Sequence, residues 1–256
     1  MTVQVERQDG LAIVTLARPE KKNAITMEMR EQLWEAFEGF GEDDQVKAVI
    51  LTGAGGDFCS GMDVGEFGSR DMSATLLRMR RLHRISRAIY TLKKPTIAAV
   101  AGVCAGVGWS YALSCDLLLA SETARFAQFF NKTALAPDGG AVWLLARNVG
   151  LMRAKELTYS GRMVYADEAV ALNLALEKTS EADLLNRAIE LGQQFAKGPP
   201  LALEMAKRQY ELAVNTDFSS FLETESAMQP LLMRSNDYLE GVNAFRERRK
   251  PAFGGN

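Results

Sequence analysis

A stretch of 21 residues without a formal charge, from Pro95 to Cys115, constrains the fold of this chain more than any other segment. It is as long as a membrane-spanning helix, but it is rich in alanine and glycine rather than leucine, and its character changes midway. Thr96–Val100 is apolar and partly β-branched, which predicts a buried strand. Three glycines separate it from the helical pattern of Trp109–Leu113. We therefore predict a strand, a glycine turn and a helix whose free N-terminal N–H groups suit a developing oxyanion.

Composition and charge narrow the class of protein. The chain has 256 residues, of which 47% are hydrophobic and 24% charged, as in ordinary soluble globular proteins. The net charge of -2 gives no reason to expect nucleic acid as a partner, and we expect no membrane partner either. Basic clusters at Arg78–Arg81 and Arg246–Lys250 are typical of solvated helix faces, although either could bind a small anion.

The cysteines and the N-terminus indicate a reducing compartment. Three cysteines without a C-x-x-C pair favour buried free thiols over a disulfide or a metal site. Residues 1–10 carry charges and no apolar run, so no signal peptide is predicted, and a cytoplasmic location is expected. The three cysteines are Cys59, Cys104 and Cys115.

Strands and helices alternate along most of the chain, which predicts an α/β fold. Asp9 and Gly10 join two alternating runs in a hairpin, and Thr26 is placed to cap a helix running to about Phe40. Asp138 precedes a helix that Gly150 closes. Further strands are expected at Val46–Leu51, Thr96–Val100, Cys115–Ala120 and Arg125–Ala127, and a second long helix at Ser73–Leu92.

The last quarter of the chain has long amphipathic helical patterns and no strand. Pro200–Val214 is one such pattern and Phe218–Arg249 is another. We predict a core with the active site over residues 1–197 and a helical region over residues 198–256. A helical region with apolar faces and no sheet to cover is expected to form an oligomer contact.

Several segments of the chain resemble those of a known protein family. The segments RPEKKNAI, VKAVILTGAGGDFCSGMDV, KPTIAAVAGVCAGVGW, CDLLLASETARFA, LAPDGGAVWLLARNVG and EGVNAFRERRKPAF, in this order and spacing, are similar to the enoyl-CoA hydratase/isomerase (crotonase) superfamily. The resemblance covers almost the whole chain. It implies a spiral of ββα turns with a C-terminal helical trimerisation region, assembled as a homotrimer or a dimer of trimers. It also implies a coenzyme A thioester as substrate, with no metal or redox cofactor.

The resemblance also assigns site residues. Members of this family hold the thioester carbonyl with two backbone N–H groups, and the matching positions are Met62 and Val107. The family usually has glycine at the second position, and valine retains the N–H group. The substrate-binding positions implied are Asp63, Val64, Gly65, Gly106 and Phe130, together with Phe245 and Arg248, which would reach the coenzyme from a neighbouring subunit.

The acid and base positions favour isomerisation over hydration. Family hydratases use two glutamates, and the matching positions hold Ser110 and Phe130. Asp138 instead matches the aspartate of epoxyphenylacetyl-CoA isomerases and related double-bond isomerases. Such an isomerase needs only one group that removes a proton and returns it elsewhere, and an apolar pocket would raise the pKa of that group. A helix N-cap is the alternative role for Asp138.

His83 supports a second hypothesis. The aryl-CoA dehalogenase branch has a histidine twelve residues before the matching proline, and Pro95 minus twelve is His83. Asp138 would then be a nucleophile and His83 the base that activates water for hydrolysis. Two tryptophans of that branch are replaced here by Phe130 and Leu82, which weakens the match. A third hypothesis is an acyl-CoA-binding relative that has lost catalysis.

Overall fold

A six-stranded sheet forms the centre of the molecule in the computed structural model, which describes residues 1–66, 68 and 71–255. The strand order is β1-β2-β3-β4-β6-β9, with β1 antiparallel to β2 and every other neighbouring pair parallel. The predicted α/β fold is therefore confirmed. The strands are β1 (Val3–Gln8), β2 (Leu11–Leu16), β3 (Ala48–Gly53), β4 (Thr96–Val100), β6 (Leu117–Ser121) and β9 (Glu177–Thr179).

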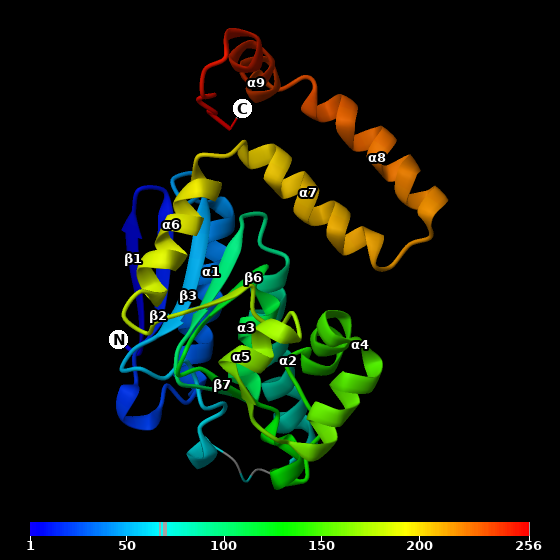
Figure 1. Ribbon diagram of the computed structural model, residues 1–256. Helices are drawn as coiled ribbons and strands as arrows, with labels where there is room; N and C mark the ends of the chain where they lie inside the picture. The colour runs from blue at the N-terminus through cyan, green and yellow to red at the C-terminus, as the bar shows by residue number, and fades with distance from the viewer. Residues whose placement is uncertain (67, 69–70, 256) are drawn as a thin grey trace.

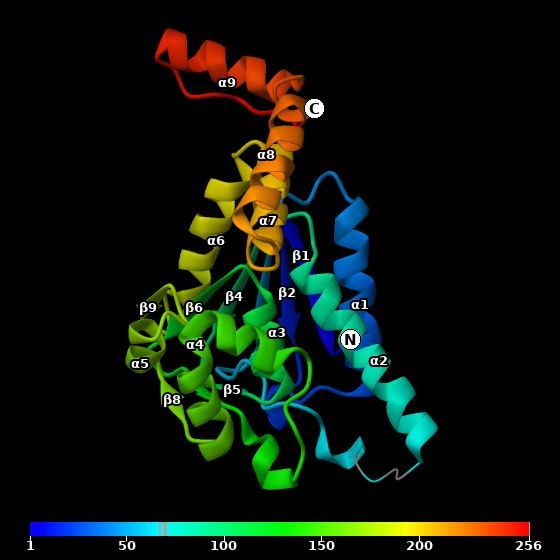
Figure 2. The same ribbon diagram turned by 90° about the vertical axis from the view of Figure 1, so that its right-hand side faces the viewer.

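Helices cover both faces of this sheet, as Figure 2 shows. The parallel strands carry apolar side chains on both faces of the sheet, as expected where both faces are buried. Ile13, Ile50 and Ile97 pack against α6 (Leu184–Ala196). The opposite face packs against the α1 and α2 side of the molecule, where the larger part of the core lies. The helices on that side are α1 (Met27–Glu42), α2 (Met72–Tyr90) and α3 (Val107–Ser114).

A second, three-stranded sheet lies beside the first and was only partly predicted. It has the order β5-β7-β8 and consists of β5 (Val103–Ala105), β7 (Arg125–Ala127) and β8 (Val164–Tyr165). The sequence predicted β7 but only a glycine turn between β4 and α3. Residues 103–105 instead form a strand because their backbone pairs with β7 and with Cys59. The helix expected after Asp138 is α4 (Ala141–Ser160), which Gly150 interrupts with φ 75° and ψ 161°.

The C-terminal helices leave the core, as Figure 1 shows at the top of the view. These are α7 (Pro200–Ala213), α8 (Phe218–Leu232) and α9 (Asn236–Glu247). The prediction of one helix over Phe218–Arg249 was wrong, because Ser235 accepts a hydrogen bond from the Tyr238 N–H and so starts a new helix. Large apolar side chains are exposed on this arm, as on an oligomer contact: Tyr210, Val214, Phe218, Leu222, Leu231 and Met233. The boundary at residue 197 and the oligomeric state stay predictions.

The remaining elements complete the description. The part of the chain that the structure describes contains no helix long and apolar enough to cross a membrane. All three cysteines are buried and free, as predicted, and burial raises the pKa of the Cys59 and Cys115 thiols to about 12. The short elements are η1 (Pro19–Lys21), η2 (Val64–Glu66), η3 (Phe129–Thr133) and α5 (Ala166–Ala171).

Gly108 allows α3 to pack closely against the backbone and side chain of Cys59. A Cβ atom at Gly108 would lie 2.6 Å from Cys59 Cβ and 2.8 Å from its carbonyl oxygen. We therefore expect Gly108→Ala to lower the free energy of unfolding by about 1–3 kcal/mol in urea unfolding. Gly39→Ala is the matched control, because nothing lies within 4 Å of a Cβ there in the interior of α1. It should raise the same quantity by about 0.5–1 kcal/mol, and equal effects at both positions would contradict this packing.

Candidate active site

The Met62 amide is directed by a parallel backbone bridge between Ile25 and Met62. The Ile25 N–H donates to the Gly61 carbonyl over 2.8 Å, and the Asp63 N–H donates to the Ile25 carbonyl over 3.0 Å. In a parallel pairing the residue between these two bonds directs its own N–H group to the opposite side. The Met62 N–H therefore points away from Ile25, and no hydrogen bond among the described residues uses it.

The Val107 amide is free because Val107 is the first residue of α3. The preceding Gly106 donates its N–H to Ala127 O over 3.0 Å and adopts φ 54° and ψ -129°, a conformation that favours glycine. The first N–H groups of a helix have no partner within the helix. In the described ranges no other group accepts the Val107 N–H either.

The two free amides are neighbours in space. Cys59 and Cys104 form a second parallel bridge, in which the Ala105 N–H donates to the Cys59 carbonyl over 2.8 Å. Two residues further along each strand, a Cβ atom at Gly106 would lie 3.7 Å from Gly61 Cα. Two N–H donors at adjoining positions can stabilise one developing oxyanion. The geometry thus supports the hypothesis of an oxyanion hole at Met62 and Val107.

The two positions that hold glutamate in family hydratases provide no carboxylate here. The Phe130 ring lies over the glycine turn, since its Cζ atom is 3.9 Å from a Cβ atom built on Gly106. Ser110 is fully buried in α3 and donates to Asp138 O over 2.9 Å. A Cβ atom at Gly139 would lie 2.9 Å from Ser110 Cβ. Ser110 therefore fixes the backbone of the Asp138 loop against α3.

Asp138 has a half-buried side chain with one oxygen that lacks a partner. Its Oδ1 atom is buried and receives no hydrogen bond from the described residues. Burial raises the pKa of this carboxyl from 3.8 to about 6, while His83, Arg30 and Arg78 lower it by smaller amounts. The alternative of a helix N-cap is wrong: Gly140 caps α4 without a side-chain bond. The Asp138 carboxylate is therefore free to meet a substrate.

His83 lies on α2 and influences the pKa of Asp138. The His83 side chain is exposed. Among the groups that lower the pKa of Asp138 against the effect of burial, it has the largest effect. Leu82, the adjacent residue, is fully buried in the core. The structure therefore brings His83 within electrostatic range of Asp138.

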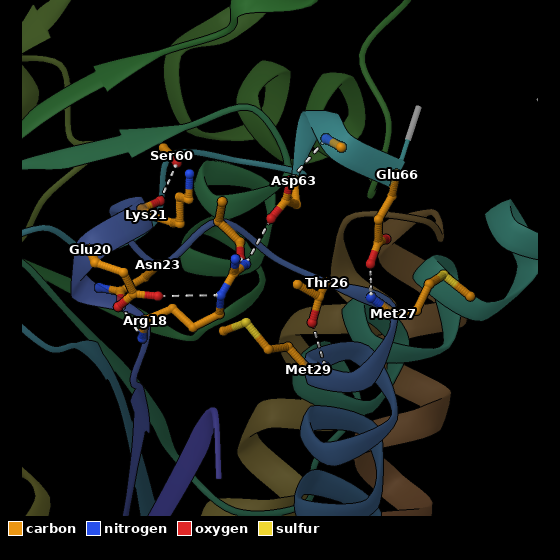
Figure 3. A network of polar contacts seen from close by, with 12 residues as sticks. Arg18, Glu20, Lys21, Asn23, Thr26, Met27, Met29, Ser60, Asp63 and Glu66 are labelled. Atoms are coloured by element: carbon orange, nitrogen blue, oxygen red, sulfur yellow. Dashed lines mark hydrogen bonds and ion pairs between the residues drawn. The ribbon is translucent and has the colours of Figure 1, made fainter. Parts of the chain in front are cut away.

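The loop after Met62 is anchored by two acidic residues, Asp63 to Arg18 and Glu66 to the start of α1, as Figure 3 shows. Asp63 accepts hydrogen bonds from Arg18 Nη1 and from the Gly65 N–H, both over 2.9 Å. Glu66 accepts from the Met27 N–H over 2.6 Å. The Asp63 carboxylate is thus occupied within the chain, while the neighbouring Val64 side chain is 74% exposed. Contact of Asp63, Val64 and Gly65 with a substrate stays a prediction.

Two predicted coenzyme contacts lie far along the chain on α9. Phe245 is 86% exposed, and Arg248 is the exposed residue that ends α9. Within one chain they do not join the residues around Asp138. The adjacent Arg249 is paired with Glu240 and Glu247, so this part of the basic cluster has a structural role.

The sequence did not identify several buried polar residues at the site. Asn23 donates to the carbonyls of Ala54 and Asp57 and so holds the loop that leads to Cys59. Arg30 is 1% exposed and pairs with Glu66 over 3.0 Å. A signal was present, because Arg30 shares the apolar face of α1, three residues before Leu33. No cluster of three or more metal-ligating side chains occurs among the residues described.

The sequence profile of the enoyl-CoA hydratase/isomerase family matches residues 6–256. The chain belongs to this family. The 1,2-epoxyphenylacetyl-CoA isomerase of Escherichia coli is 34% identical over 254 residues, covering 97% of this chain and 96% of the relative. A Rhodobacter capsulatus protein named "Probable enoyl-CoA hydratase" is 33% identical, covering 99% and 98%. The crystal structure of an enoyl-CoA hydratase from Bacillus anthracis superposes with a TM-score of 0.96 at 28% identity, covering 100% of both chains.

Family membership makes this chain an enzyme of coenzyme A thioesters, as the resemblance implied. It also assigns the chain to the crotonase superfamily. The names of the relatives include both hydratases and an isomerase, so they do not decide between the two reactions. That decision depends on the side chains around Met62 and Val107.

The buried charge of Asp138 should lower stability at neutral pH. The unfolded chain releases this proton near pH 4 and the folded chain near pH 6, so stability falls as the pH rises through this window. Asp138→Asn lacks the charge and should raise the free energy of unfolding at pH 7.5 by about 1–2 kcal/mol, a figure reduced for partial exposure. The gain should shrink as the pH is lowered towards 4. Urea unfolding at both pH values measures it, with exposed Asp44→Asn as control; a loss of stability at pH 7.5 would contradict the burial.

Proposed function

We propose that this enzyme is a coenzyme A thioester isomerase of the double-bond or epoxyphenylacetyl-CoA type, in which Asp138 moves the proton. The observation that carries the proposal is the buried Asp138 Oδ1 atom without a partner, in the loop that Ser110 holds against α3. Nearby Asp63 and Glu66 are each paired with an arginine. Asp138 is thus the acidic residue of this region whose carboxylate is available to a substrate.

Isomerisation of the double-bond type needs one base and one oxyanion site. Asp138 removes a proton from the carbon next to the thioester carbonyl, and the electron pair of that C–H bond moves onto the carbonyl oxygen. The Met62 and Val107 N–H groups stabilise the resulting enolate. The protonated Asp138 then returns the proton at the far end of the conjugated system as the carbonyl reforms. Atoms and charge balance without water or a cofactor.

Hydration is disfavoured by the same residues. It requires one group to activate water and another to deliver a proton, which family hydratases achieve with two glutamates. Ser110 is occupied with the Asp138 backbone, and Phe130 presents a ring over the glycine turn. Neither side chain can act as a general base at neutral pH.

Removing the Asp138 carboxylate tests the proposed role. Asp138→Asn should lower kcat for double-bond isomerisation by about 10²–10⁴-fold, the contribution of a positioned base. Binding of the thioester should persist. The wild-type kcat/KM should rise as the pH increases through about 6 and then level off, because the base is the ionised form. Asp44→Asn, an exposed change, is the control, and full activity of Asp138→Asn would refute the proposal.

A second candidate is a dehalogenase or hydrolase that uses Asp138 as nucleophile and His83 as base. One feature favours it: among the groups that lower the pKa of Asp138 against the effect of burial, His83 has the largest effect. In that reaction Asp138 Oδ1 attacks the aryl carbon with loss of halide, which forms an aryl ester, or the acyl carbon with loss of thiolate, which forms a mixed anhydride; water activated by His83 then hydrolyses that intermediate. The isomerase proposal is preferred because it needs no contribution from an exposed histidine.

Isotope labelling separates the two reactions. In a single turnover in water enriched in oxygen-18, the dehalogenase or hydrolase would place the label on the Asp138 carboxylate, whereas the isomerase would leave it unlabelled. We expect no label in a peptide mass spectrum. His83→Gln should retain isomerase activity within about tenfold, a loss smaller than removal of a catalytic base causes. Binding of several acyl-CoA thioesters with turnover of none would instead indicate a binding protein without catalysis.

A further inference from the structure

Arg30 is a buried cation on α1 that contacts the loop after Met62. Its side chain is 1% exposed on the apolar face of α1. Nη2 pairs with Glu66 Oε2 over 3.0 Å, and Nη1 approaches the Met27 sulfur at 2.9 Å. The Nε–H group has no hydrogen-bond partner among the described residues. A buried donor without a partner is costly, so such a group calls for an explanation.

Tyr111 presents a second buried group of this kind. It lies on α3, one helical turn after Val107, and is fully buried. Its hydroxyl has no partner in the described part of the chain. Tyr111 packs in the same core cluster as Met29 and Cys59, the neighbours of Arg30 and of the oxyanion segment. Tyr111 directly follows Ser110, which binds the Asp138 carbonyl, and Arg30 binds Glu66 in the loop after Met62, so the two residues belong to elements that border the two free amides.

Asp138 completes a group of three. Its Oδ1 atom lacks a partner as well, and its backbone carbonyl accepts a hydrogen bond over 2.9 Å from Ser110, the residue before Tyr111. The three side chains come from α1, from α3 and from the loop before α4, yet no hydrogen bond joins them to one another. Two of the three atoms belong to donor groups, each of which an acceptor oxygen of a ligand could satisfy. A saturated hydrocarbon chain would leave both donors without a partner.

We propose that Arg30 and Tyr111 select acyl groups that carry an oxygen acceptor, such as a keto, ether or carboxylate oxygen, in addition to the thioester carbonyl. This inference rests on the proposed site and names its substrate class. A site built to hydrogen-bond an oxygen discriminates strongly against an analogue that lacks it, because its buried polar groups are then left unpaired. The Arg30 and Tyr111 donors therefore determine specificity, while Asp138 and the two amides perform the chemistry.

A purely structural role for Arg30 makes a different prediction. If Arg30 served only to hold Glu66 and the loop after Met62, its removal would weaken the binding of all thioesters by the same factor. Glu66→Gln disturbs the same ion pair but leaves the Arg30 Nε–H group in place. This variant is therefore the matched control for a change that acts through the loop.

Binding of saturated thioesters tests selection without requiring turnover. We would measure Kd by calorimetry for hexanoyl-, 4-oxohexanoyl-, 5-oxohexanoyl- and adipyl-CoA, so that neutral and anionic oxygens are compared at one chain length. At least one oxygen-bearing thioester should bind about tenfold more tightly than hexanoyl-CoA, as one satisfied hydrogen bond allows. Arg30→Met and Tyr111→Phe should each reduce this ratio to below about threefold, whereas Glu66→Gln should preserve it.

Two outcomes would overturn the inference: no preference in the wild-type enzyme, as expected if an ordered water satisfies the donors, or an unchanged ratio in both variants. Tyr111→Phe removes one oxygen atom, so it remains informative if Arg30→Met fails to fold. The result is independent of the isomerase proposal. An oxygen preference together with a fully active Asp138→Asn enzyme would refute the isomerase and retain the selection, and the reverse pair of results would do the opposite.

Discussion

Two isolated backbone bridges determine the geometry of the site. The bridge between Ile25 and Met62 directs the Met62 N–H away from Ile25, and the bridge between Cys59 and Cys104 places the adjoining segment beside it. Side chains contribute little to this arrangement, which depends on backbone hydrogen bonds and on the close approach of Gly106 and Gly61. The proposed oxyanion site is therefore formed by the fold itself, and such a site can serve different reactions when the surrounding side chains change.

Those side chains distinguish this chain within its family. Ser110 stands where a hydratase has a glutamate, and its hydroxyl binds the Asp138 backbone instead. Burial keeps the pKa of Asp138 near 6, which suits a group that must both accept and return a proton near neutral pH. The same burial lowers stability at neutral pH, a common cost of a functional site. The Arg30 Nε–H group and the Tyr111 hydroxyl are further buried polar groups without partners among the described residues.

Much of the fold was predictable because its signals are local. Alternating apolar runs, the Thr26 cap and the break at Gly150 all follow from neighbouring residues. The strand β5 was missed because three residues pair only through distant partners, and the division between α8 and α9 was missed because one serine causes it. At the site, Met62, Val107 and Asp138 came from the family resemblance, not from local pattern. The pairing of Arg30 with Glu66, from elements 36 positions apart, was not predictable from spacing.

The central claim is that Asp138 removes a proton from the carbon next to a thioester held by the Met62 and Val107 amides. Exchange of that hydrogen in deuterium oxide tests this step most directly, because it requires no movement of a double bond. With phenylacetyl-CoA as the probe, proton NMR should show the hydrogens beside the thioester carbonyl exchanging in the presence of the wild-type enzyme. Exchange with Asp138→Asn should not exceed the rate without enzyme. Equal exchange with both enzymes, or none with the wild type, would contradict the account.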